Sequence, residues 1–90
     1  MNEADVREGL DKLPGWSGDT KSLRREFSFA DFNAAMVFVN RVAEVAAEQN
    51  HHPDIDIRYS KVFLSLSSHD AGGVTKRDLK LAEAISRLSA

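Results

Sequence analysis

The three histidines of this chain fall in two short stretches, His51-His52 and His69. Imidazole has an ordinary pKa of about 6.5, so it can donate or accept a proton near neutral pH. Several imidazoles in one cleft are therefore typical of general acid–base catalysis. A single loop histidine is more often a solvated or hydrogen-bonded polar residue. The catalytic interpretation thus depends on the two stretches meeting in the fold.

A three-histidine zinc site is a second interpretation of the same residues. Adjacent histidines in an extended segment point to opposite sides, which disfavours binding of one ion by both His51 and His52. The chain has no cysteine, which excludes disulfides, thiolate chemistry and cysteine zinc sites. Gly72-Gly73 lacks the context of a nucleotide-binding motif, and no Ser-His-Asp motif is evident. We therefore expect no metal.

A predicted hairpin would bring the two histidine stretches together. Ile55, Ile57 and Tyr59 alternate with Asp54, Asp56 and Arg58, and Val62, Leu64 and Leu66 alternate with Lys61, Phe63 and Ser65. This period of two predicts two strands with a tight turn near Ser60. In an antiparallel hairpin, the residues before the first strand and after the second lie side by side. His51-His52 and His69 occupy those two positions, at the ends of elements where scaffolds usually present functional side chains.

The remaining elements are read from caps, turns and apolar spacing. They are a first helix capped by Asn2 and ended by Pro14-Gly15, a short strand at Trp16-Ser17, a strand from Leu23 to Phe29, a helix from Asp31 to about Gln49, and a last helix that begins with a Thr75/Asp78 capping box. The order α-β-β-α-β-β-α predicts an α+β fold, a four-stranded antiparallel sheet with three helices packed on one face. We expect a single domain over residues 1–90.

Composition narrows the class of protein. Hydrophobic residues make up 42% of the chain and charged residues 29%, as in an ordinary globular domain. The net charge of -2 gives too little positive field to hold a nucleic-acid backbone. The acidic first residues are followed by no apolar run, so we expect no secretory signal, no membrane span and a cytoplasmic location.

The spacing of the polar residues resembles that of a known family. The segment Asn50-His51-His52-Pro53 is followed by Tyr59 after five residues, by His69 after nine more and by Asp78 after another eight. This pattern is similar to that of the pterin-4a-carbinolamine dehydratase family. Further matches lie upstream, at Gly15-Trp16, at residues 27–32 and along the helix to Val42-Ala43. The family's fold agrees with the order of elements read above.

The resemblance implies dehydration of 4a-hydroxytetrahydropterin to the quinonoid dihydropterin, the step that recycles the cofactor of aromatic amino-acid hydroxylases. It implies that His51 and His69 are acid–base residues on the two faces of the pterin ring, that His52 binds and orients the pterin, and that no metal or bound cofactor is required. The predicted site comprises the catalytic residues His51, His52 and His69 and the substrate-binding residues Asn50, His51, His52, Ser67, Ser68 and His69.

Other residues of the pattern have simpler explanations. Asp78 is also the third residue of a helix that Thr75 caps, and we favour that structural role. Tyr59 and Trp16 are expected in the core or the pocket wall rather than as catalysts. Family members usually carry a charged residue four positions before the first histidine, where this chain has Ala47.

Two alternative functions stay open. Mammalian members of the family also act as dimerisation cofactors for a homeodomain transcription factor, so a non-catalytic interaction module is the competing class. A pterin-binding member of another pathway, such as molybdenum-cofactor metabolism, is the third. We expect a small-molecule pterin partner and, because the sheet has exposed edges and the family forms dimers and tetramers, a homodimer or homotetramer.

Overall fold

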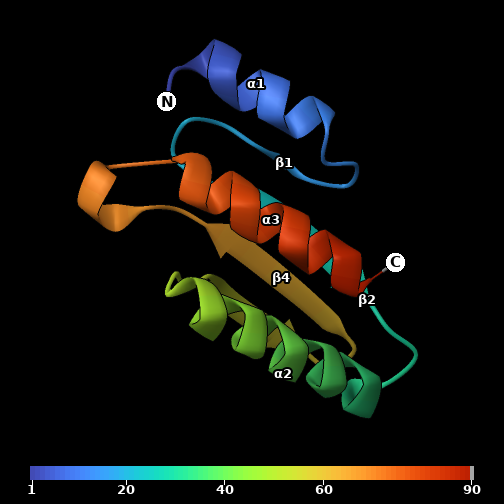
Figure 1. Ribbon diagram of the computed structural model, residues 1–90. Coiled ribbons are helices and arrows are strands. Elements are labelled where there is room, and N and C mark those ends of the chain that lie inside the picture. Colours follow the sequence, from blue (N-terminus) through green and yellow to red (C-terminus); the bar gives the residue numbers. More distant parts are fainter. Residues whose placement is uncertain (90) are drawn as a thin grey trace.

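The computed structural model describes residues 1–89 and contains three α-helices, four strands and one short 3-10 turn within them (Figure 1). Their bounds are α1 Glu3–Asp11, β1 Ser17–Gly18, β2 Leu23–Ser28, α2 Phe32–Gln49, β3 Asp54–Arg58, β4 Lys61–Leu66, η1 His69–Ala71 and α3 Lys76–Leu88. The predicted α+β class and the order α-β-β-α-β-β-α are confirmed.

The four strands form one antiparallel sheet in the order β1-β2-β4-β3. In its centre, Leu23 of β2 lies opposite Leu66 of β4 and Phe27 opposite Val62. On the other side of β4, Asp54 of β3 lies opposite Ser65. Since successive side chains point to opposite faces, this register places Leu23 and Phe27 of β2 and Val62, Leu64 and Leu66 of β4 on the same face.

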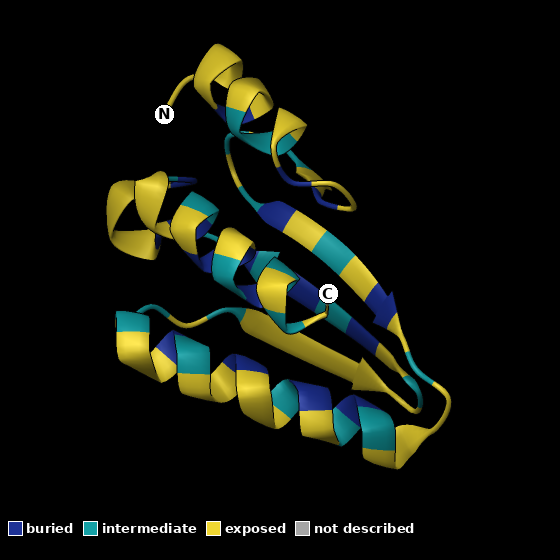
Figure 2. Cartoon of the chain, turned by 45° about the vertical axis from the view of Figure 1, so that its right-hand side comes forward, coloured by how far each residue is buried: buried dark blue, intermediate teal, exposed yellow. Residues whose placement is uncertain are grey.

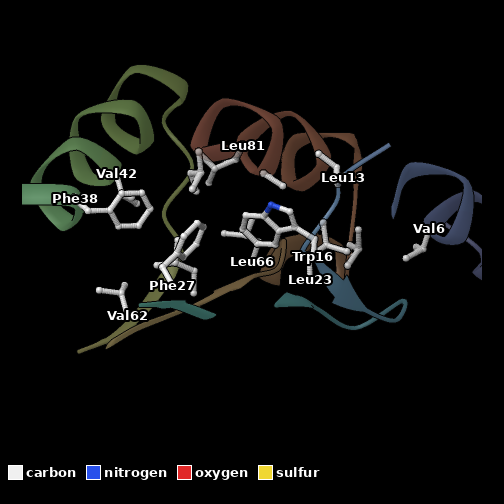
Figure 3. Close-up of a cluster of buried hydrophobic side chains, with 14 of the residues drawn as sticks. Val6, Leu13, Trp16, Leu23, Phe27, Phe38, Val42, Val62, Leu66 and Leu81 are labelled. Carbon is white, nitrogen blue, oxygen red and sulfur yellow. The ribbon is translucent and has the colours of Figure 1, made fainter. Parts of the chain in front are cut away.

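Helices α2 and α3 cover that apolar face and leave the other face of the sheet open (Figure 2). Side chains from the central strands and both helices meet in one core, where Trp16, Phe27, Phe38, Leu66 and Leu81 lie close together (Figure 3). Helix α1 packs outside this layer, with Gly9 against the side chain of Leu79 in α3. The sheet therefore has a helical side that holds the core and an uncovered side.

The start and the buried face of α2 have clear local causes. Asp31 caps the first turn, because its Oδ1 accepts a hydrogen bond of 2.8 Å from the amide of Ala34. Between the caps, Ala35, Phe38 and Val42 recur every three or four residues and are buried.

None of the helices within residues 1–89 has the length and apolar character needed to cross a membrane.

Two predicted boundaries differ from the structure near the first turn. Helix α1 ends at Asp11, before Pro14, and the chain tightens there, with the amides of Lys12 and Leu13 donating to the carbonyls of Gly9 and Leu10 three residues earlier. The first strand is shifted by one residue, from Trp16-Ser17 to Ser17–Gly18. Gly18 has φ +149, and a Cβ there would lie 2.2 Å from the carbonyl oxygen of Ser22, so only glycine allows this close pairing.

The expectation for Tyr59 is wrong. This residue forms the turn between β3 and β4, is 77% exposed and has φ 60, so it belongs neither to the core nor to the wall of a cavity. The sequence pattern placed it at the end of the strand with the parity of Ile55 and Ile57. The chain turns before the side chain can pack. Trp16, by contrast, is buried as expected.

Candidate active site

The end of helix α2 places the first histidine pair. Asn50 adopts the left-handed conformation, with φ 49 and ψ 42, and the amide of His51 donates to the carbonyl of Ala46 over 3.1 Å. This six-to-one bond after a left-handed residue is the Schellman ending of a helix. Asparagine tolerates that conformation better than most residues, so the sequence itself sets where α2 stops. The ending directs His51 away from the helix axis and into the segment before β3.

The second histidine position is held by a small closed loop after β4. Ser68 and Gly73 pair in both directions, with N···O distances of 3.0 and 3.2 Å, and the 3-10 turn η1 lies between them. Gly72 closes the turn with φ 73. His69 is the first residue of η1 and is exposed. Its position is therefore defined by the loop backbone rather than by burial of its side chain.

These elements bring the two histidine stretches around one cavity of about 240 Å³. Its lining contains five of the six predicted site residues together with one additional acid: Asn50, His51, His52, Ser67, His69 and Asp70. The antiparallel register of β3 and β4 explains the meeting, because Asp54 lies opposite Ser65 and the chain continues from this pair to both stretches. Ala47, one helical turn earlier, is exposed and is not part of the lining.

The sixth predicted residue, Ser68, lies behind the cavity instead. Its side chain is buried, and its Oγ donates to Oδ2 of Asp78 over 2.8 Å and lies 2.8 Å from Oγ1 of Thr75. The alternation of β4 continues past its last residue, Leu66, so Ser67 and Ser68 point to opposite sides. Ser67 therefore faces the cavity, while Ser68 faces the start of α3.

Asp78 connects this buried network to the histidines. It is the third residue of α3, and its Oδ2 accepts the amide hydrogen of Thr75 over 2.9 Å, as the predicted capping box requires. Its other oxygen, Oδ1, lies 2.5 Å from Nε2 of His51. The side chain of Asp78 is 0% exposed and that of His51 is 11% exposed. The same carboxylate thus caps a helix and contacts a histidine of the cavity.

Asp70 is the cavity residue that sequence reasoning missed. The guanidinium of Arg77 donates to its Oδ1 over 2.7 Å, and this hydrogen bond, together with the charge of Arg77, lowers the pKa of Asp70 below its ordinary value of 3.8. Asp70 is therefore ionised near neutral pH and adds negative charge beside His69. The sequence does contain a signal for this residue, because Asp70 directly follows a candidate histidine and Arg77 comes seven residues later.

Among residues 1–89, no group of three or more metal-binding side chains is arranged to hold an ion. A larger hollow of about 480 Å³ lies on the uncovered face of the sheet, with Glu26, Asp56 and Phe63 in its lining. Size alone would favour this hollow as a binding site. All three histidines, however, line the smaller cavity, and imidazole is the side chain best suited to acid–base chemistry near neutral pH.

An antiparallel sheet covered on one face by helices, with three imidazoles around one cavity and a carboxylate behind them, defines a small α+β protein with a candidate acid–base site. Residues 1–88 match the family model described as pterin 4 alpha carbinolamine dehydratase. The chain belongs to this family, as the resemblance predicted.

Curated relatives agree over nearly the whole chain. A protein of Thermomicrobium roseum is 46% identical over 89 residues, which is 99% of this chain and 96% of that protein. A protein of Acidobacterium capsulatum is 52% identical over 83 residues, 92% of this chain and 90% of that protein. Both are named for pterin-4-alpha-carbinolamine dehydratase, an assignment that their names mark as provisional.

Two solved structures show the same fold. The transcriptional coactivator/pterin dehydratase from Brucella melitensis superposes with a TM-score of 0.94 at 30% identity, over 100% of this chain and 98% of that chain. A pterin dehydratase-like protein identified as a RuBisCO assembly factor of the alpha-carboxysome superposes with a TM-score of 0.68 at 18% identity, over 83% and 87% of the two chains. At that identity, the second likeness concerns the fold alone.

Proposed function

We propose that this protein is a 4a-hydroxytetrahydropterin dehydratase that forms the quinonoid dihydropterin and water. The observation that carries the proposal is the single cavity around which His51, His52 and His69 lie. Membership of the family supports the substrate class. The cavity, at about 240 Å³, is slightly smaller than pockets for drug-sized ligands, which suits a bicyclic ring.

The dehydration needs two proton transfers, and two imidazoles can perform both. An imidazolium protonates the 4a-hydroxyl as the carbon–oxygen bond breaks, and the leaving group departs as water. A neutral imidazole takes the proton from the ring nitrogen, whose electron pair forms the new carbon–nitrogen double bond. The two imidazoles end with exchanged protonation states, which solvent resets. We assign these roles to His51 and His69, and the orientation of the pterin to His52 together with Asn50 and Ser67.

The test uses His69 first, because its exposed side chain contributes little to the fold. In an assay of water loss from freshly generated 4a-hydroxytetrahydropterin, His69→Gln is expected to lower kcat/KM by about 100- to 10,000-fold, the usual contribution of a general acid or base. Lys80→Gln, an exposed substitution on α3, is the matched control and keeps full activity. A fully active His69→Gln variant would exclude this mechanism.

An interaction module is the second candidate function, and the hollow on the uncovered face of the sheet favours it. A partner bound there would contact Glu26, Asp56 and Phe63, which are remote in sequence from the histidines. A pure binding module keeps its partner in the His69→Gln variant and shows no turnover in the native chain. Turnover by the native chain that depends on His69 decides for the enzyme.

We also propose that the protein forms a homodimer through β3, in the cytoplasm. β3 is an edge strand whose residues are all exposed, and its apolar members Ile55 and Ile57 are 37% and 36% exposed. An uncovered edge of this kind favours pairing with another strand. If Ile57 lies opposite Ile57 of a second copy, Asp56 lies opposite Arg58 at two places. This two-fold antiparallel register matches both charge and apolar surface.

Charge exchange tests this register. Asp56→Arg or Arg58→Asp alone places like charges opposite each other across the interface, so each is expected to weaken the dimer in sedimentation experiments. The double exchange restores both pairs and is expected to recover the dimer. A native chain that stays monomeric, or a dimer that none of the three variants changes, would exclude pairing through β3.

A further inference from the structure

Among residues 1–89, the carboxylate of Asp78 is the one buried titratable group whose role the proposed mechanism leaves unassigned. Its side chain is 0% exposed, and it has three close partners: Nε2 of His51 at 2.5 Å, Oγ of Ser68 at 2.8 Å and the amide of Thr75 at 2.9 Å. An ionised carboxylate only accepts hydrogen bonds, so all three partners must donate. The hydrogen between His51 and Asp78 therefore resides on Nε2.

The hydroxyl groups behind the carboxylate fit the same arrangement. Ser68 has a single hydroxyl hydrogen and directs it to Asp78. Its oxygen, 2.8 Å from Oγ1 of Thr75, is left to accept the hydroxyl hydrogen of Thr75. Thr75 Oγ1 accepts in turn from the amide of Arg77 over 3.2 Å. Each group in this buried network has one consistent direction of donation, and that direction ends at Asp78.

The second nitrogen of His51 is placed differently. Nδ1 has no hydrogen-bond partner within residues 1–89, whereas every buried side-chain nitrogen and oxygen in that range has one. Nδ1 is therefore accessible to water, and His51 is part of the cavity lining. One nitrogen of the ring is committed to the protein, and the other is free for a ligand.

We infer that Asp78 is a positioning residue that keeps a hydrogen on Nε2 of His51 in both charge states, so that Nδ1 is the atom that gains and loses the catalytic proton. The assignment of the tautomer stands on the contacts alone, and its catalytic consequence rests on the proposed dehydratase function. A capping role by itself does not account for the geometry, since the cap uses only Oδ2 and leaves Oδ1 directed at the histidine.

The variant Asp78→Asn tests the inference, because it keeps the size of the side chain and replaces one acceptor oxygen with an NH2 donor. The amide oxygen of the asparagine can replace Oδ2 and accept from Ser68 and from the amide of Thr75. Its NH2 group then faces Nε2 of His51 and donates to it. The neutral imidazole must present a lone pair at Nε2 and carry its hydrogen on Nδ1, which is the opposite tautomer. An analogous change in serine proteases yields the wrong histidine tautomer and a loss of about 10,000-fold.

Nitrogen NMR of the ¹⁵N-labelled full chain gives the decisive readout. The spectra are recorded at increasing pH until the ¹⁵N shifts themselves show a neutral ring. We expect hydrogen on Nε2 in the native chain and on Nδ1 in Asp78→Asn. Thr75→Ala weakens the start of α3 without changing the charge of Asp78, and we expect it to keep the native tautomer. A native chain with hydrogen on Nδ1 would overturn the inference, whether or not the variants fold.

Turnover of 4a-hydroxytetrahydropterin separates this inference from the proposed function. We expect Asp78→Asn to lower kcat/KM at least about 100-fold, while the tautomer changes as described. If the tautomer changes and the native chain has no turnover, the proposed function fails and the positioning of His51 stands. If the native chain turns over and Asp78→Asn keeps both the native tautomer and the native rate, the inference fails and the dehydratase function stands.

Discussion

The His51–Asp78 contact makes a quantitative prediction for the stability of His51→Ala. Asp78 is 0% exposed and His51 is 11% exposed, so removal of the imidazole leaves a buried carboxylate without one of its three close hydrogen-bond partners. Breaking a buried pair in this way usually costs about 3–5 kcal/mol. Ser68 and Thr75 still donate to Oδ2, so we expect a loss of about 3 kcal/mol, the low end of that range. Chains of this length have a free energy of unfolding of roughly 5–13 kcal/mol, which makes the loss readily measurable.

Urea unfolding at one fixed protein concentration measures this loss. His52→Ala is the matched control, because its exposed side chain should change the free energy of unfolding by less than about 0.5 kcal/mol. Asp78→Asn is expected to change the free energy of unfolding in opposite directions in two backgrounds. It destabilises the native chain, where it removes the partner of His51. It stabilises the His51→Ala variant, where it removes a stranded charge and still caps α3.

Two results would refute the reasoning about the pair. One is a loss of less than about 1 kcal/mol in His51→Ala, which is the range of an exposed pair. The other is an equal loss from Asp78→Asn in both backgrounds, which would mean that the two side chains do not interact. In either case, Asp78 would act only as a helix cap.

Three further predictions concern the scaffold. Gly73→Ala is expected to lower the free energy of unfolding by at least about 1–3 kcal/mol, because the new Cβ would lie 2.4 Å from the carbonyl oxygen of Thr20; thermal unfolding measures this. Leu66→Ala, which truncates a side chain with 0% exposure, is expected to cost about 2–5 kcal/mol in urea unfolding, and a loss under about 1 kcal/mol would contradict the core described here. Arg77→Ala is expected to return the pKa of Asp70 toward 3.8 in an NMR titration. Because the fold lowers the pKa of Asp70, its ionised carboxylate stabilises the native chain at pH values above the ordinary pKa of 3.8. This stabilisation is lost as the pH falls through the lowered pKa. The native and Arg77→Ala chains should therefore converge in free energy of unfolding at acid pH.

Much of the fold follows from local signals in the sequence. The hairpin of β3 and β4 could be predicted because both strands keep a period of two, with Phe63 as the exception, and α2 could be predicted because Asp31 caps an uninterrupted apolar stripe. The end of α1 was harder to place. The prediction used Pro14 as the stop, but the restriction acts on the residue before proline, and the helix has already ended at Asp11.

The candidate site likewise combines features that local sequence signals predict with features that they do not. The meeting of His51-His52 with His69 follows from strand pairing, which the alternation of residues predicts. The contact of Asp78 with His51 joins residues 27 positions apart through the packing of α3, and no local pattern encodes it. Ser68 was assigned to the cavity because it precedes His69, although alternation along β4 turns it to the other side. The contacts of Asp78 and Ser68 are therefore set by tertiary packing and not by the residues next to them in the sequence.

The contact between His51 and Asp78 joins the last turn of one helix to the first turn of another. Any change that makes either helix terminus fray therefore also moves the imidazole on which we place the chemistry. Efforts to make this protein more heat-resistant should leave the Asn50 ending and the Thr75 cap untouched and work instead on the far ends of α2 and α3. Thermal stability can then be raised without moving His51, and the rate of turnover can be altered separately.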